Sequence, residues 1–169
     1  MNRTKKLAQF SLMVTLALIL SYVESQIPAL IAVPGVKLGL TNLVVLVTLY
    51  CIDRKSAIII NIIRIFLVGL LFGNGMSLLF SLAGGILSGL VMILLYSSGK
   101  FSILLVSIAG GIAHNIGQIL VAMLVLQTNA IAWYLLILWF SGIISGALIG
   151  LIGGMLCQRL EPMFKKQNT

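Results

Sequence analysis

"IAWYLLILWFSGIISGALIGLIGGML", residues 131–156, contains no charged side chain. A helix needs about 20 predominantly apolar residues to cross the hydrocarbon core of a bilayer, so this run predicts a membrane-spanning helix. The whole chain of 169 residues has the same character, with 60% hydrophobic and 8% charged residues and a mean hydropathy of +1.19. This composition indicates an integral membrane protein and leaves no room for a soluble domain.

Charged, proline and glycine residues divide the remaining sequence into similar apolar runs. We therefore expect one all-α domain over residues 1–169, built as a compact bundle of about six transmembrane helices. The predicted spans lie near residues 7–25, 38–52, 56–73, 77–96, 101–126 and 131–156. All the connections are tight except the first, at residues 26–37.

The formal net charge of +8 would suit a nucleic-acid partner, but the positions of the basic residues exclude that interpretation because they mark the membrane boundaries. With the N-terminus in the cytoplasm, nine of them fall inside and only Lys37 falls outside. The positive-inside rule therefore predicts that both termini are cytoplasmic. The nine are Arg3, Lys5, Lys6, Arg54, Lys55, Lys100, Arg159, Lys165 and Lys166.

Small residues recur every four positions in two of the predicted spans. Such residues let helices approach closely in lipid. In the last span they are Gly142, Gly146, Gly150 and Gly154, for which we favour packing within the bundle over a separate partner surface. In the first span they are the pairs Ser11 with Thr15 and Ala17 with Ser21.

Arg64 is the clearest functional candidate, because ionisable groups inside a bilayer are costly and usually face the bundle interior or a wet cavity. It lies about 12 Å inside the third predicted span, one turn after Asn61. The chain has three acids, and Glu24 is the one placed to neutralise it within the membrane, with Lys37 competing. The excess positive charge would suit an anionic or electron-rich ligand, whereas a purely structural arginine would instead snorkel or cap carbonyls.

The fifth predicted span contains "GGIAHNIGQ", which places hydrogen-bonding groups on one helix face. His114 and Gln118 share this face and Asn115 lies at its edge. Contact with a ligand and a structural hydrogen bond between helices are equally good explanations. A single histidine without cysteine or carboxylate neighbours does not indicate a metal site, and we expect no cofactor.

No catalytic signature is present in the sequence. It has no acid-rich metal motif, no activated nucleophile and no phosphate-binding P-loop. We therefore expect a protein that is not an enzyme, and one that depends on an ion gradient or a separate motor if it transports a substrate.

Four motifs in order, "LSYVESQIP", "VPGVKLGLTNLVVLVTLY", "FSLAGGILSGLVM" and "GGIAHNIGQILVA", resemble the bacterial family called heptaprenyl diphosphate synthase component I, or the Gx transporter family. The likeness covers nearly the whole chain. The fold of that family resembles the six-helix substrate-binding S components of energy-coupling factor (ECF) transporters.

The resemblance implies a multi-pass protein of the bacterial cytoplasmic membrane, in contact with lipid, that helps import a small anionic or polar-headed molecule. Its partners would be a transmembrane coupling protein and two ATPases, which bind to helix faces rich in small residues, including one on the first helix. The alternative is a non-catalytic membrane subunit, either of polyprenyl diphosphate and menaquinone synthesis or of flavin- and quinone-linked extracellular electron transfer. Polar placement and the family motifs together give the candidate ligand contacts Glu24, Lys37, Asn42, Arg64, His114, Asn115 and Gln118.

The first connection is expected to serve as both a turn and part of this site. Pro28 and Pro34 restrict its backbone and oppose helix continuation, while Gly35 permits a tight turn. Glu24 precedes it, and Lys37 and Asn42 follow near its end. We therefore predict a stiff external cap.

Overall fold

The computed structural model describes residues 3–26, 39–73, 75–127 and 133–165, and nearly all of them are helical. The six helices are α1 (Arg3–Gln26), α2 (Leu40–Cys51), α3 (Arg54–Leu71), α4 (Gly75–Ser98), α5 (Ile103–Leu126) and α6 (Tyr134–Lys165). They confirm the all-α bundle and follow the predicted spans closely. The largest difference is that α6 continues beyond the expected end near residue 156, because a helix keeps its backbone hydrogen bonds after its side chains turn polar.

Four of the described helices are long and apolar enough to cross a membrane, at Lys6–Gln26, Gly75–Ser98, Ile103–Leu126 and Leu135–Leu160. Large apolar side chains cover the outer surfaces of these helices, among them Leu12, Leu94 and Leu124. Such a surface is unfavourable in water and suits lipid, so the protein is a membrane protein.

The other two helices differ from the predicted full spans. With 12 residues, α2 extends about 18 Å, which is less than the roughly 30 Å of the hydrocarbon core. The 18 residues of α3 include three basic side chains, Arg54, Lys55 and Arg64. Neither is an ordinary apolar span by itself.

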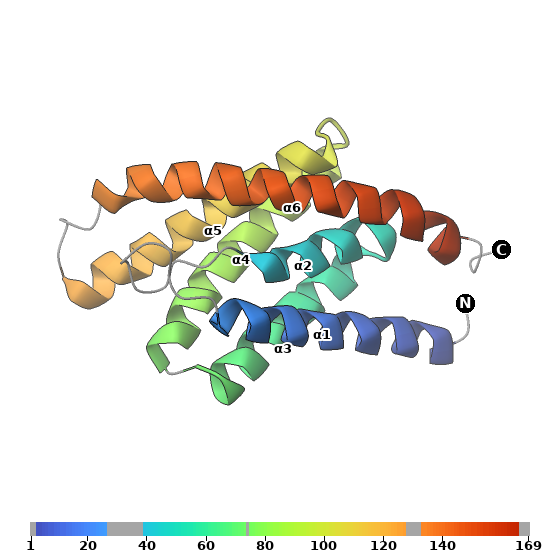
Figure 1. Cartoon of the computed structure of the whole chain (residues 1–169), viewed down its shortest axis with the longest axis horizontal. Helices are drawn as coiled ribbons and strands as arrows, with labels where there is room; N and C mark the ends of the chain where they lie inside the picture. The colour runs from blue at the N-terminus through green and yellow to red at the C-terminus, as the bar shows by residue number, and fades with distance from the viewer. Residues whose placement is uncertain (1–2, 27–38, 74, 128–132, 166–169) are drawn as a thin grey trace.

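The short helix α2 forms the centre of the bundle. Most of its side chains are buried, and it packs against α1, α3 and α6. One apolar cluster joins Leu46 and Leu49 to α3, α4, α5 and α6, and a second joins Val44 and Val47 to α1, α3 and α6. In Figure 1, α2 lies between α1 and α6. The first residues of α2 are therefore held inside the protein, with consequences for the site.

Helix α5 packs closely against α4 on one side and α6 on the other. A Cβ atom added at Gly117 would lie 2.6 Å from the carbonyl oxygen of Ala83 on α4. One added at Gly146 would lie 2.7 Å from Cα of Ile108 on α5. Gly142 and Gly150 also face α5, so most of the glycine stripe of α6 lies against a neighbouring backbone within the bundle.

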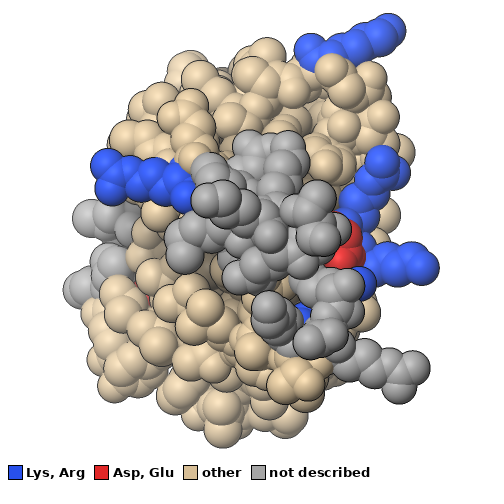
Figure 2. All heavy atoms as spheres, turned by 90° about the vertical axis from the view of Figure 1, so that its right-hand side faces the viewer, with Lys and Arg blue, Asp and Glu red and all other residues tan. Residues whose placement is uncertain are grey.

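The start of α1 and the end of α6 lie at the same end of the bundle (Figure 1). Seen from that end, lysine and arginine side chains project around the rim beside one acidic patch (Figure 2). The exposed basic residues Lys6, Arg54, Lys55, Lys100 and Arg159 come from helix ends and turns. Asp53 caps α3, since its side chain accepts a hydrogen bond from the backbone N–H of Ser56 at 2.7 Å.

Candidate functional site

Polar side chains are buried near the first turn of α2 and along the inner face of α5. The group comprises Ser21, Glu24, Thr41, Asn42, Asn61, Arg64, His114, Asn115 and Gln118. Buried polar groups are costly unless they are hydrogen-bonded, so their partners indicate whether each has a structural role.

Arg64 is 7% exposed and binds three neutral oxygens. Its Nε donates to Oδ1 of Asn61 at 2.9 Å, and its Nη2 donates to Oδ1 of Asn42 at 3.1 Å. Its Nη1 donates to the hydroxyl of Thr41. Asn61 is in turn fixed to α4, because its Nδ2 donates to the carbonyl oxygen of Gly85 at 2.8 Å. The guanidinium group therefore ties α3 to the start of α2 without snorkelling to the surface.

Glu24, near the end of α1, binds the backbone at the start of α2. One of its carboxylate oxygens accepts from the N–H of Gly39 and from the N–H of Leu40 at 3.3 Å. A carboxylate at this position is favoured by the positive end of the helix dipole. The negative charge of the same carboxylate attracts the positive charge of Arg64, as the count of acids in the sequence suggested. Gly39 has a φ of 75°, a left-handed conformation that suits glycine.

Helix α5 supplies three of the predicted contacts. The ring of His114 packs on α4 at Gly84, where an added Cβ would lie 2.9 Å from Cε1. Asn115 points to α6 and donates from Nδ2 to the carbonyl oxygen of Leu138 at 2.6 Å. Gln118 follows His114 by one turn and is 4% exposed. Asn115 is thus a bridge between helices, which was one of its two expected roles.

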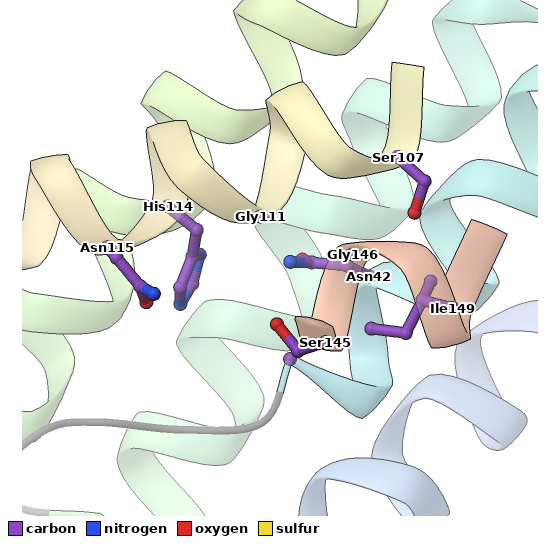
Figure 3. A pocket seen from close by; sticks show the side chains of 9 residues that line it. Asn42, Ser107, Gly111, His114, Asn115, Ser145, Gly146 and Ile149 are labelled. Atoms are coloured by element: carbon purple, nitrogen blue, oxygen red, sulfur yellow. The ribbon is translucent and has the colours of Figure 1, made fainter. Parts of the chain in front are cut away.

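Two small polar cavities meet at Gly39 and His114. The first, of about 20 Å³, is lined by Ser21, Glu24, Gly39, Thr41, Arg64, Ile65, Val68, Ser81 and His114. The second, of about 10 Å³, is lined by Gly39, Asn42, Ser107, Gly111, His114, Asn115, Ser145, Gly146 and Ile149. Figure 3 shows the side chains of His114 and Asn115 reaching from α5 toward the space in which Asn42 and Ser145 lie. Each of these two cavities has room for about one water molecule.

The structure brings most of the predicted ligand contacts together. Glu24, Arg64 and His114 share the first cavity, while Asn42, His114 and Asn115 share the second. Gln118 lines neither cavity but lies one turn from His114. Lys37 and the connection with Pro28, Pro34 and Gly35 lie outside the described residues, so the predicted cap stays a prediction.

The two small-residue pairs predicted on α1 lie on different faces of the helix. Ala17 and Ser21 are buried in the bundle, whereas Ser11 and Thr15 are exposed. The hydroxyl of Thr15 donates to the carbonyl oxygen of Ser11 at 2.9 Å. Positions 15 and 17 are separated by about 200° around a helix, so the two pairs cannot face one partner together.

Several lining residues were not among the predicted ligand contacts, and Thr41 and Ser145 are two of them. Thr41 binds Arg64 and could have been found from its place beside Asn42 at the start of a predicted span. Ser145 lines the second cavity, but in the sequence it is a single serine beside Gly146 and gives no distinct signal. Within the described part of the chain, no three histidine, cysteine, aspartate or glutamate side chains are grouped to hold a metal ion.

These features define an α-helical membrane protein whose polar core is built around a buried arginine. Residues 13–156 match the family model for heptaprenyl diphosphate synthase component I, and the chain belongs to that family. The family is a non-catalytic component of the synthase, and its name implies association with other synthase components. Neither the curated proteins nor the solved structures that were compared with the chain gave a match.

Proposed function

We propose that this protein is the substrate-binding membrane component of an uptake system, similar to an S component, and that it binds a small anionic or polar-headed molecule. The buried Arg64 beside a polar cavity carries the proposal. A buried guanidinium is costly in a membrane, and apolar residues would pack the bundle at lower cost.

Arg64 retains capacity for a ligand after its contacts with the protein are counted. A guanidinium has five N–H donors, and three of them are used by Asn61, Thr41 and Asn42. Glu24 reduces the local positive charge, but its carboxylate is shared with the N–H groups at the start of α2. A carboxylate, phosphate or carbonyl oxygen in the first cavity would therefore find unused N–H donors on a charged group.

The size of the two cavities indicates how such a molecule would enter. Each accepts about one water molecule, so a vitamin-sized molecule requires the first turn of α2 to separate from α5. That turn is held by side-chain bonds to Glu24 and Arg64. A ligand oxygen that replaced one of these bonds would offset part of the cost of opening.

Native mass spectrometry of the protein purified from its own membrane tests this proposal. We expect a small polar molecule bound to the wild type and to Arg54→Met, but not to Arg64→Met. Arg54 is the matched control because it is exposed, its Cζ lies 5.6 Å from the ring centroid of Tyr96, and it is about 15 Å from Arg64 along α3. Arg64→Lys keeps the charge and serves as a second variant if Arg64→Met does not fold. A wild-type protein without a bound polar molecule contradicts the proposal.

The family name favours a second candidate function, a non-catalytic membrane subunit that associates with a polyprenyl diphosphate synthase. The same arginine would then bind the diphosphate of a prenyl chain lying in the lipid. Co-purification separates the two functions, because a coupling protein with ATPases supports uptake and a prenyl synthase supports the subunit. The mass of the bound molecule gives an independent answer.

A further inference from the structure

Gln118 on α5 is a buried amide for which the described part of the chain supplies no hydrogen-bond partner. Its side chain is 4% exposed, and within the described residues neither Oε1 nor Nε2 of its amide has a partner. The other buried amides in this region differ, because Asn42, Asn61 and Asn115 each bind a neighbour. A buried amide with both ends unsatisfied is unfavourable, so packing alone gives no reason for it.

The position of Gln118 connects it with the polar core. It lies one helical turn, or about 6 Å along the axis, from His114, which lines both cavities. Its neighbour Gly117 lies against α4, and the exposed Leu120 marks the opposite, outer face of α5. The amide thus extends the polar face of α5 beyond the two cavities and away from the lipid side.

We infer that Gln118 is a specificity-determining contact for a ligand group that presents a donor and an acceptor side by side. An amide carbonyl accepts and an amide NH₂ donates, so the pair matches the edge of an amide, an imide or a nitrogen heterocycle. A site with buried groups of this kind discriminates against analogues that lack the matching edge, because the protein groups are then left unpaired. The inference rests on the proposed function, since Arg64 would bind the polar head of the same molecule.

This role predicts opposite effects of one substitution on stability and on binding. Gln118→Leu removes both unsatisfied atoms and keeps similar bulk, so the protein without added ligand should melt at the same or a higher temperature. A structural amide would behave differently, because its removal would lower the melting temperature. Gln158→Leu is the matched control, since Gln158 is exposed near the other end of the bundle.

The test uses purified full-length protein in detergent, with thermal unfolding for stability and ¹⁹F NMR for binding. The probe is 5-fluorouracil, whose ring carries an imide edge, and fluorobenzene is the probe without that edge. We expect the wild type and Gln158→Leu to bind 5-fluorouracil in preference to fluorobenzene, and Gln118→Leu to lose at least about tenfold in affinity for 5-fluorouracil. A fall in melting temperature of about 3 °C or more for Gln118→Leu, or equal binding of the two probes by the wild type, overturns the inference.

These outcomes are separate from those for the proposed function. If Arg64→Met loses its bound molecule while Gln118→Leu keeps wild-type affinity for the probe, the inference fails and the proposed function stands. If native mass spectrometry finds no polar molecule on the wild type, the proposed function fails even where the probe binds at Gln118.

Discussion

Gly111→Ala tests the close approach of α5 and α6, which forms one wall of the second cavity. The added methyl group would lie 2.5 Å from the carbonyl oxygen of Gly142, whereas ordinary van der Waals contact begins at 3.4 Å. Helix α6 must therefore retreat by about 0.9 Å, and a gap of this size forfeits a quarter to a half of the dispersion energy of neighbouring contacts. We expect Gly111→Ala to lower the free energy of unfolding by about 1–3 kcal/mol, which is typical of overpacking.

The assay is reversible unfolding, followed by circular dichroism, as sodium dodecyl sulfate is titrated into mild detergent micelles. Gly154→Ala is the control, because its added Cβ would lie 3.4 Å from Cγ2 of Ile103, an ordinary contact. Both substitutions replace glycine by alanine within a helix, so the gain in helix propensity is similar in the two. We expect Gly154→Ala to be as stable as the wild type, or more stable by up to about 1 kcal/mol because of this propensity gain. Equal stability of Gly111→Ala and Gly154→Ala would refute the reasoning.

Three further predictions concern the helix ends. Asp53→Ala removes the cap on the N–H of Ser56 and should lower the free energy of unfolding by about 0.5–2 kcal/mol in the same titration. Asp53→Asn should restore most of that loss. An Asp53→Ala protein as stable as the wild type would show that the cap contributes nothing. Glu24→Ala removes the acceptor for the N–H of Gly39 and should destabilise the protein by about 1–3 kcal/mol, with Glu24→Gln intermediate; the opposite order would contradict the interaction. Lys100 is predicted to lie on the cytoplasmic side. Lys100→Cys, in a background without the two native cysteines, should therefore react in intact cells only with a membrane-permeant maleimide. Labelling by an impermeant reagent would show that residue 100 lies outside and would contradict the predicted orientation.

Hydropathy predicted the helices well because crossing a bilayer imposes a length and an apolar composition that can be counted directly. The same counting could not show that α2 is a central helix rather than a full span. Its burial depends on α1, α3 and α6 surrounding it, which is a property of the packed chain. The extension of α6 to Lys165 was missed for a related reason, since hydropathy detects the membrane boundary and not the helix end.

Most residues of the candidate site could be predicted from the sequence, but their hydrogen bonds could be predicted only in part. Arg64 and Glu24 were identified from charge placement, and the structure brings them to one cavity. Their hydrogen bonds to Thr41 and to the N–H of Gly39 depend on how the chain returns into the bundle after α1. Helical geometry alone shows that Ser11 lies on a different side of α1 from the pair Ala17 and Ser21. Only the packing of the bundle shows which of the two sides is buried.

The most direct test of the central claim is the equilibrium affinity of Arg64→Met for the molecule that native mass spectrometry finds on the wild type. Isothermal titration at fixed ionic strength should show a loss of at least about tenfold, because Arg64 supplies charge-assisted hydrogen bonds to the ligand. Arg54→Met should match the wild type. An affinity of folded Arg64→Met within about twofold of the wild type would show that the buried arginine only joins α3 to α2, and would contradict the proposed binding site.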